Sequence, residues 1–393
     1  MSPRFTPHKV GLTTSAVGLV ALLSMPFGGV ARLRIVDAAP ARLFEALGAP
    51  HAWLLLSLWV ALLVTSLPGA RSRTLALIRG LLAGAAIPVL LWLSGVAAVR
   101  SLAPLSPLAR YSMGSGVWLA AFAAFALVMA SRHEVGDGGF DALLVALLPL
   151  AGIAAVIATG GVVRLGIVVE YHNVSSDLLL WTGQHVAYSA IALTIAVAFG
   201  VALGIFAHRS PKAADAVFTT TSVFQTIPGL AMIGILAVPL GLLAEKVPAA
   251  HALGIGVLGW APIVVALTLY ALLAIVRNTY AGLNSVPGSI VEAARGMGLS
   301  GGQVLRKVEL PLAAPIIFSG VRIAAQQTIG NATLGVFVAA GTLGRPIFGG
   351  VAQTATDLVL LGSITLVTLA LLTDGLMRAA QRLVSPRRSK GAR

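Results

Sequence analysis

The chain has 393 residues, of which 58% are hydrophobic and 10% charged, and its mean hydropathy is +0.94. A soluble domain carries about 25% charged residues, so this composition excludes an ordinary soluble protein and indicates a chain buried largely in lipid. The net charge of +14 comes from Lys and Arg in loops between apolar stretches, a distribution that argues against nucleic-acid binding.

Five apolar stretches in the first part of the chain are long enough to cross a membrane at about 20 residues per span. They lie at about 12–30, 52–69, 75–99, 112–130 and 141–163. The basic residues before the first stretch also fit a cleaved signal peptide, but the spans that follow directly favour an uncleaved first helix. Spans with almost no ionisable residue offer an ion or a polar solute little to bind. We therefore expect residues 1–165 to be a transmembrane scaffold.

A less apolar segment, residues 166–183, interrupts this pattern with charges and with Tyr171, His172 and Trp181. Tyr and Trp favour the membrane interface, so we expect an interfacial connector on the extracytoplasmic side. Further spans are expected at about 185–207, 217–243, 252–276, 312–338 and 358–380, before a basic cytoplasmic tail at 383–393. The predicted fold class is an all-α polytopic membrane protein of about ten transmembrane helices, with its second module at 184–382.

One polar interruption in the second module, Asn284 to Pro311, has the pattern of two short helices joined by a turn. Ser289, followed three residues later by Glu292, fits a capping box at the start of the first helix. Gly298 stands where a helix needs a residue tolerant of positive φ in order to end. Other signals agree: Ile290, Ala294 and Met297 share one face, Ser300 and Gln303 repeat the capping signature, and Pro311 is expected to end the second helix.

The same interruption resembles the EAA loop of ABC importer permeases. Glu292-Ala293-Ala294 is followed after three residues by Gly298, and after nine more by Val308-Glu309-Leu310-Pro311, where Val308 replaces the Ile of the family pattern. The resemblance implies that the first short helix docks into a cytoplasmic ATPase subunit. The coupling residues would be Glu292, Ala293, Ala294, Arg295, Gly298, Leu310 and Pro311. The alternative is a surface hairpin in which Glu292 only caps its own helix.

The second module is similar, more narrowly, to the osmoprotectant branch of this family, which handles glycine betaine, choline and carnitine. The likeness covers residues 180–380 and rests on the stretches 225–230, 277–280, 291–298 and 327–334. Residues 1–165 are an addition that resembles the longer permease of a betaine-uptake system with two different permeases. The resemblance implies a five-helix type I permease core that pairs with a second permease, identical or homologous. It also implies an extracytoplasmic solute-binding protein that carries most of the selectivity.

The sequence contains no catalytic motif that we can identify. It has no phosphate-binding Gly-x-x-x-x-Gly-Lys-Ser/Thr loop, so ATP hydrolysis by that route is excluded and ATP and Mg would be bound by the partner ATPase. The absence of cysteine excludes thiolate chemistry. The seven histidines are scattered without metal-ligand spacing, so we expect no metal site. We expect a non-catalytic transport subunit that binds no cofactor itself.

Two groups of uncharged polar residues lie inside apolar spans and are candidates for a translocation path. They are Gln225, Thr226 and Pro228 in the first group, and Gln327, Thr328, Asn331 and Thr333 in the second. The alternative is hydrogen bonding between helices, worth about 0.6 kcal/mol each, and spacing alone leaves both open. Aromatic faces that could hold a quaternary ammonium group are few: Tyr188, Phe224, Trp260, Tyr270 and Phe337.

The distribution of Lys and Arg predicts the topology. If the hairpin is cytoplasmic, alternating spans place both termini inside as well, and more Lys and Arg then fall inside than outside, as in the bacterial inner membrane. One rival hypothesis is a secondary transporter driven by an ion gradient, which would call for membrane-embedded carboxylates and an inverted repeat. The others are an ABC importer permease for another small solute, and a membrane scaffold without transport activity.

Overall fold

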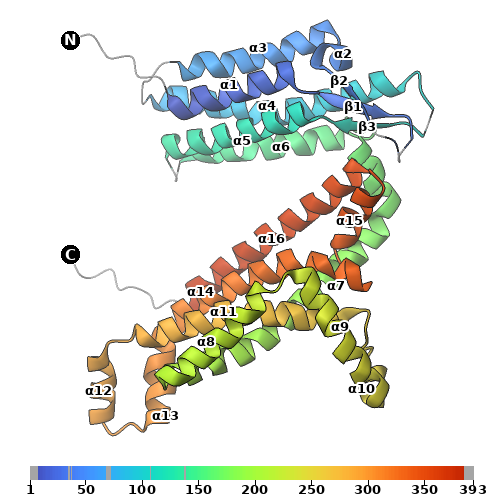
Figure 1. Ribbon diagram of the computed structural model, residues 1–393. Coiled ribbons are helices and arrows are strands. Elements are labelled where there is room, and N and C mark those ends of the chain that lie inside the picture. The colour runs from blue at the N-terminus through green and yellow to red at the C-terminus, as the bar shows by residue number, and fades with distance from the viewer. Residues whose placement is uncertain are drawn as a thin grey trace, which may run out of the picture. The chain divides into compact units, whose positions relative to one another are not determined.

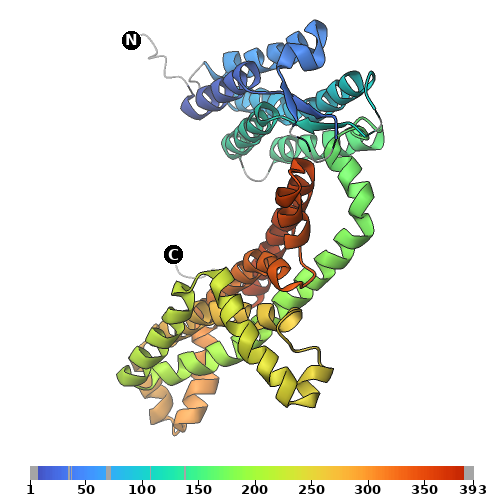
Figure 2. The same ribbon diagram turned by 45° about the vertical axis from the view of Figure 1, so that its right-hand side comes forward.

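The computed structural model describes residues 8–33, 36, 38–67, 72–106, 108–136 and 139–384. The chain forms two compact units, which Figures 1 and 2 colour along the sequence. Unit 1 comprises Met1–Asn173 and Val351–Leu358, and unit 2 comprises Val174–Gly350 and Val359–Arg393. Most of the predicted basic tail at 383–393 lies outside the described residues.

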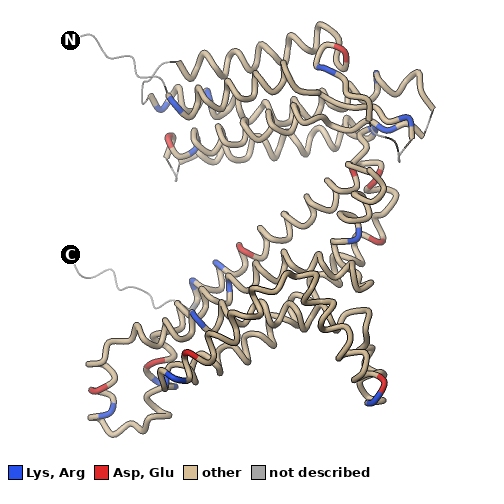
Figure 3. Tube along the Cα trace, viewed as in Figure 1, with Lys and Arg blue, Asp and Glu red and all other residues tan. Residues whose placement is uncertain are grey.

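Unit 1 is mainly a bundle of helices. They are α1 (Lys9–Ser24), α2 (Leu43–Leu47), α3 (Ala49–Ser66), α4 (Arg73–Leu102), α5 (Ser115–Val135) and α6 (Phe140–Ala158). Helix α4 contacts α3, α5 and α6, while α1 contacts α3 and α5. The charged residues of this unit gather near the ends of the helices (Figure 3), which is the arrangement that lipid around the middle of the helices requires.

A small antiparallel sheet lies at one end of these helices (Figure 1). Its strands are β1 (Gly28–Ala31), β2 (Ala39–Ala41) and β3 (Arg110–Met113), in the order β2-β1-β3. Gly28 pairs with Met113, and a Cβ on Gly28 would lie 2.0 Å from Tyr111 Oη. The glycine therefore makes room for the tyrosine. The sequence did not predict this sheet, because strands of three or four residues leave almost no periodic signal.

The first predicted span, 12–30, is wrong at its end. Helix α1 stops at Ser24, and Gly28–Ala31 pairs as a strand instead. The helix has 16 residues, about 24 Å, which is shorter than the hydrocarbon core of about 30 Å. Pro26 and Gly28 end the helix where apolar composition alone would extend it.

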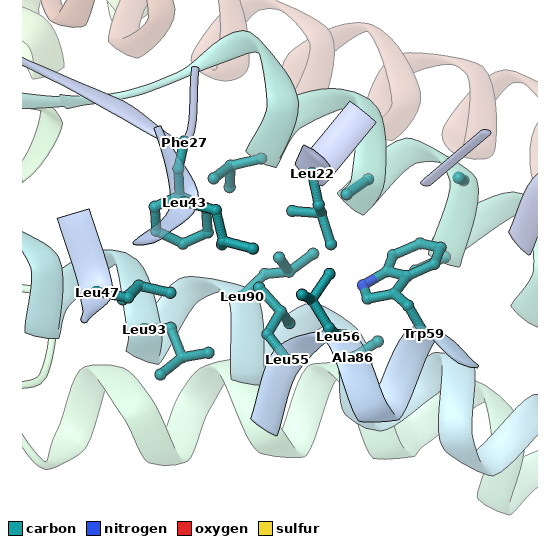
Figure 4. Packing of buried hydrophobic residues seen from close by; sticks show 14 of the residues in the cluster. Leu22, Phe27, Leu43, Leu47, Leu55, Leu56, Trp59, Ala86, Leu90 and Leu93 are labelled. Atoms are coloured by element: carbon teal, nitrogen blue, oxygen red, sulfur yellow. The ribbon is translucent and has the colours of Figure 1, made fainter. Parts of the chain in front are cut away.

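The buried core of unit 1 lies between α1, α3, α4 and α5 (Figure 4). Trp59 is fully buried, and Gly18 makes space for it, because a Cβ at Gly18 would lie 1.9 Å from Trp59 Cζ3. Leu22, Leu55 and Leu90 belong to the same cluster. In a membrane, contacts through small residues are what bring helices together closely, and Gly18 has that role here.

Unit 2 holds the remaining helices and most of α7. They are α7 (Gly166–His208), α8 (Pro211–Thr226), α9 (Gly229–Lys246), α10 (Pro248–Ala252), α11 (Trp260–Asn284), α12 (Gly288–Gly296), α13 (Gly301–Val304), the π-helix η1 (Leu305–Glu309), α14 (Leu310–Asn331), the 3₁₀-helix η2 (Ala332–Val338), α15 (Gly344–Ala352) and α16 (Thr356–Val384). Helix α11 is central, since it contacts α8, α9, α14 and η2.

Helices α11 and α14 pack closely because α14 has a glycine at the contact. A Cβ on Gly320 would lie 2.5 Å from Asn278 Cβ and 2.8 Å from the carbonyl oxygen of Ala274. The approach of α14 therefore depends on the absence of a side chain at Gly320.

Three predictions for the second module need correction. Residues 166–183 do not interrupt the helical structure, because α7 runs through them with one kink at Val174. The span expected at 217–243 is two helices, α8 and α9, separated at Ile227 and Pro228, since proline cannot continue a helix. The next span begins at Trp260 rather than at 252. Nine helices among the described residues are long and apolar enough to cross a membrane.

Candidate functional site

Helix α12 is the first of the two short helices of the predicted hairpin, which protrudes from one end of unit 2 (Figure 1). The helix begins at Gly288 after Pro287, which supplies no side-chain cap. Ser289 therefore lies inside the first turn, and the predicted capping box between Ser289 and Glu292 is wrong. With Pro287 at the N-cap, Ser289 is the second helical residue and does not occupy the position from which a side chain caps the helix.

The end of α12 follows the prediction. Gly298 has φ +84°, and its N–H donates to the Arg295 carbonyl at 2.9 Å, while the Leu299 N–H donates to the Ala294 carbonyl at 3.2 Å. These two bonds form a Schellman motif, which satisfies carbonyls at a helix end. No atom lies within 4 Å of the Cβ position at Gly298, so its backbone conformation alone favours glycine.

Apolar side chains on α12 and at its C-terminal end are exposed. Ala294 is buried, whereas Ile290 is 42% and Met297 75% exposed. The predicted coupling residues Glu292, Ala293 and Arg295 are also exposed. An exposed helix that combines charges with bare apolar side chains is suited to contact a partner.

The second half of the hairpin differs from its prediction at Pro311. The capping box of Ser300 and Gln303 is confirmed, with the Ser300 N–H donating to Gln303 Oε1 at 2.8 Å. The helix does not end at Pro311, however, but runs through η1 into α14, where Leu310 and Pro311 are its first two residues. The π-helical turn before Pro311 widens the helix at the point where the proline ring would clash.

His208, at the end of α7, connects the two ends of the hairpin. Its Nδ1 lies 2.9 Å from Oδ1 of Asn284, the last residue of α11, and its Nε2 lies 3.9 Å from Glu309 Oε1. Sequence reasoning missed this role, because Asn284 is 76 residues away along the chain and no local pattern joins them. The contact fixes where the hairpin leaves the helical bundle.

The break between α8 and α9 opens a cavity of about 360 Å³ in unit 2. The Ile227 carbonyl, which the break leaves without a helical partner, accepts a hydrogen bond from the Tyr270 hydroxyl at 2.7 Å. Gln225 Nε2 donates to the Tyr270 carbonyl at 2.9 Å. A Cβ on Gly229 would lie 2.5 Å from Leu334 Cδ1. The two hydrogen bonds fix the segment between α8 and α9 to α11.

The cavity brings together five of the seven residues predicted for the translocation path: Gln225, Thr226, Pro228, Gln327 and Asn331. Gln327 Oε1 is buried without a hydrogen-bond partner among the described residues. Thr328 and Thr333 do not line the cavity and donate instead to the backbone carbonyls of Ala325 and Gly330. Of the five candidate aromatics, Tyr270 lines it. No charged residue is among the lining residues.

His185 fixes the end of α14 beside this cavity. Its Nδ1 accepts from the Leu343 N–H at 3.3 Å, so its proton lies on Nε2, which donates to the Ile329 carbonyl at 2.9 Å. The change from α14 to the 3₁₀-helix η2 frees that carbonyl, because i→i+3 bonds replace i→i+4 bonds there. Sequence reasoning missed His185, whose partners lie far along the chain.

Charged residues join α14 to α16. Asp374 accepts from Arg322 Nε at 2.7 Å and pairs with Arg378 at 2.9 Å. Gln326 Nε2 donates to the Ala370 carbonyl at 3.2 Å. The two arginines neutralise the Asp374 carboxylate, which an apolar span would otherwise leave uncompensated.

Comparison with known proteins identifies the family. Residues 196–387 match the model of binding-protein-dependent transport system inner membrane components, and residues 7–168 match that of the ABC transporter permease YehY, N-terminal domain. The chain is 36% identical to the carnitine transport permease protein OpuCB of Listeria monocytogenes, over 58% of this chain and 97% of that protein. It is 37% identical to the choline transport system permease protein OpuBD of Bacillus subtilis, over 53% and 85%.

An inward-facing structure of the MetNI methionine ABC transporter covers 55% of this chain and 99% of its own, at 23% identity and a TM-score of 0.47. The apolar helices, the exposed hairpin and the family matches define an integral membrane subunit of an ABC transporter. More narrowly, the chain belongs to the family of binding-protein-dependent transport system inner membrane components, and its curated relatives are osmoprotectant permeases. The predicted family and fold class are confirmed, whereas the roles of the individual site residues remain predictions.

Proposed function

We propose that this chain is the permease subunit of an ATP-driven, binding-protein-dependent importer for quaternary-ammonium osmoprotectants such as glycine betaine, choline or carnitine. The observation that carries the proposal is the match of 33–37% identity to permeases whose names specify these solutes, spanning 97% of the carnitine permease. The cavity at Gln225 and Gln327 is the proposed place through which the solute passes.

The lining of the cavity suits such a solute. A glycine betaine zwitterion needs no counter-ion from the protein, and the described lining supplies amide and hydroxyl groups rather than charges. Tyr270 contributes one aromatic face, and such faces attract quaternary ammonium groups. A neutral, partly polar lining favours passage over tight binding, because a transported solute has to leave again.

The exposed helix α12 is the proposed contact with the ATPase. ATP and Mg would be bound and hydrolysed on that partner, and this chain would carry no catalytic activity. A second permease, identical or homologous, and an extracytoplasmic solute-binding protein complete the proposed importer. In this arrangement the chain crosses the bacterial inner membrane with α12 and both termini in the cytoplasm.

Uptake by the reconstituted importer tests this proposal. The complex of both permeases, the ATPase and the binding protein is placed in proteoliposomes, and uptake of labelled glycine betaine, choline and carnitine is measured with and without ATP. We expect ATP-dependent uptake that ionophores leave unchanged. Uptake that ionophores abolish would favour a secondary transporter, and ATP-dependent uptake of none of the three would contradict the assigned solute class.

A further inference from the structure

A short segment of the permease half belongs to unit 1. Val351–Leu358 contains the last two residues of α15 and the start of α16, which begins at Thr356. The first eight residues of α7, Gly166–Asn173, belong to the same unit. The two long helices that begin and end the permease half therefore both start inside the unit that the N-terminal extension builds.

One hydrogen bond fixes this segment to the sheet of the extension. Ser112 Oγ on β3 donates to Asp357 Oδ2 at 2.6 Å, and Asp357 is 7% exposed. The same carboxylate lies against the start of α7, because a Cβ on Gly166 would lie 2.0 Å from Asp357 Oδ2 and 3.1 Å from the Tyr111 carbonyl oxygen. Asp357 is thus inserted between β3 and α7, and Gly166 leaves the space for it.

The surroundings show that the segment is held firmly. Thr354 has φ +54°, a conformation that a non-glycine residue keeps only where its neighbours impose it. Ala355 is 6% exposed. A cavity of about 50 Å³ beside Asp357 is lined by Arg110, Ser112 and Glu170, and Glu170, on α7, is 2% exposed. Charged groups from β3, α7 and α16 therefore meet at one point.

We propose that the N-terminal extension acts as a clamp, formed by Ser112, Gly166 and Asp357, which holds the first turn of α16 against the first turns of α7. Asp357 is a positioning residue in this proposal. Throughout the transport cycle these two helix starts then move together, which limits the conformations open to the permease half. The consequence for transport rests on the proposed function, whereas the clamp itself does not.

Cysteine labelling tests the clamp directly, because the chain has no native cysteine. A reporter cysteine replaces the buried Ala355, and its reaction rate with a membrane-impermeant maleimide is measured in the complete importer. With the clamp closed, labelling should be slow. Asp357→Ala or Ser112→Ala should raise the rate by about tenfold, the factor that loss of a charge-assisted hydrogen bond gives in an opening equilibrium.

Two further variants separate the hydrogen bond from general damage. Asp357→Asn keeps an acceptor for Ser112 without its charge, and should label at a rate between those of the unmodified clamp and Asp357→Ala. Ser57→Ala removes an exposed hydroxyl on α3 that bonds only within its own helix, and should change nothing. A reporter at the exposed Gln353 should label rapidly in every variant, which shows that the reagent reaches this face.

Uptake by the same variants tests what the clamp does. We expect Asp357→Ala and Ser112→Ala to lower the maximal ATP-dependent uptake per folded importer by at least about fivefold, in the range of allosteric coupling energies, with KM unchanged. Asp357→Asn should restore part of the rate. Equal labelling of Ala355→Cys with and without Asp357 would overturn the clamp. Faster labelling with undiminished uptake would overturn its role in transport, and loss of all uptake in the unmodified importer would instead contradict the proposed function.

Discussion

Arg79 and Tyr111 are both buried in unit 1, and they differ in what surrounds their polar atoms. The Arg79 side chain is 2% exposed and pairs with Glu134, which also pairs with His8. Because His8 Nδ1 accepts from the Gly11 N–H at 2.8 Å, Nε2 is the ring nitrogen that meets Glu134. The three residues tie together α4, α5 and the start of α1.

Removing Glu134 should destabilise unit 1 strongly. Glu134→Ala leaves a buried guanidinium without its partner, which costs about 3–5 kcal/mol of unfolding free energy. Asp141→Ala is the matched control, because its partner Arg73 is 64% exposed and exposed pairs contribute about 0–1 kcal/mol. Thermal unfolding of the purified chain in detergent, followed by circular dichroism, measures both. Equal melting temperatures for the two variants would contradict the assignment.

Tyr111→Phe should leave stability unchanged or increase it. Burial raises the pKa of Tyr111, so the hydroxyl stays neutral, and it has no hydrogen-bond partner among the described residues. An unsatisfied buried hydroxyl costs about 1–3 kcal/mol, and phenylalanine keeps the ring without that cost. Thermal unfolding in detergent measures the change in melting temperature. A clear fall in melting temperature would show that the hydroxyl has a partner.

Gln327→Leu should slow transport without affecting insertion. The change removes a side-chain amide that lines the cavity, and loss of one hydrogen bond from its N–H to a solute carboxylate corresponds to about tenfold in rate. Thr333→Val is the control, because Thr333 does not line the cavity. Uptake is normalised to the amount of importer in the membrane. A similar loss of uptake in both variants would show that Gln327 has no specific role in the translocation path.

At the scale of elements, a local signal was correct where one residue decides the backbone conformation and wrong where neighbouring residues override it. Gly298 was predicted correctly because positive φ at a helix end depends on one residue and its immediate neighbours. The capping box at Ser289 failed, since Pro287 starts the helix two residues earlier. Pro311 failed as a helix end because a π-helical turn accommodates it. The contacts of His185 and His208 join distant parts of the chain, which no local pattern encodes.

Substitutions in α12 should separate coupling from folding. Glu292→Lys reverses an exposed charge, and Gly298→Val forces a branched residue to φ +84°, at a cost of about 1–2 kcal/mol. Both should reduce co-purification of the ATPase while the permease still inserts. Ser300→Thr, which keeps the capping hydroxyl, should retain the ATPase. Unchanged co-purification in both variants would count against α12 as the docking helix.

At the scale of the whole molecule, composition and charge predicted the class well and the boundaries poorly. Apolar content is enough to indicate spans, but it does not locate their ends. It does not show that a strand replaces the helix after Ser24, or that Pro228 divides one apolar stretch into two helices. The cavity residues were predictable as polar exceptions in apolar helices. Which of them face the cavity depends on packing, as the different positions of Gln327 and Thr328 show.

In the proposed importer, α12 faces the cytoplasm and is covered there by an ATPase. A single cysteine at Met297, which is 75% exposed, can be labelled with a membrane-impermeant maleimide in right-side-out and in inverted membrane vesicles. We expect labelling in inverted vesicles alone, and protection when the ATPase is co-expressed. Labelling in right-side-out vesicles would show that α12 lies on the extracytoplasmic side and is not the ATPase contact.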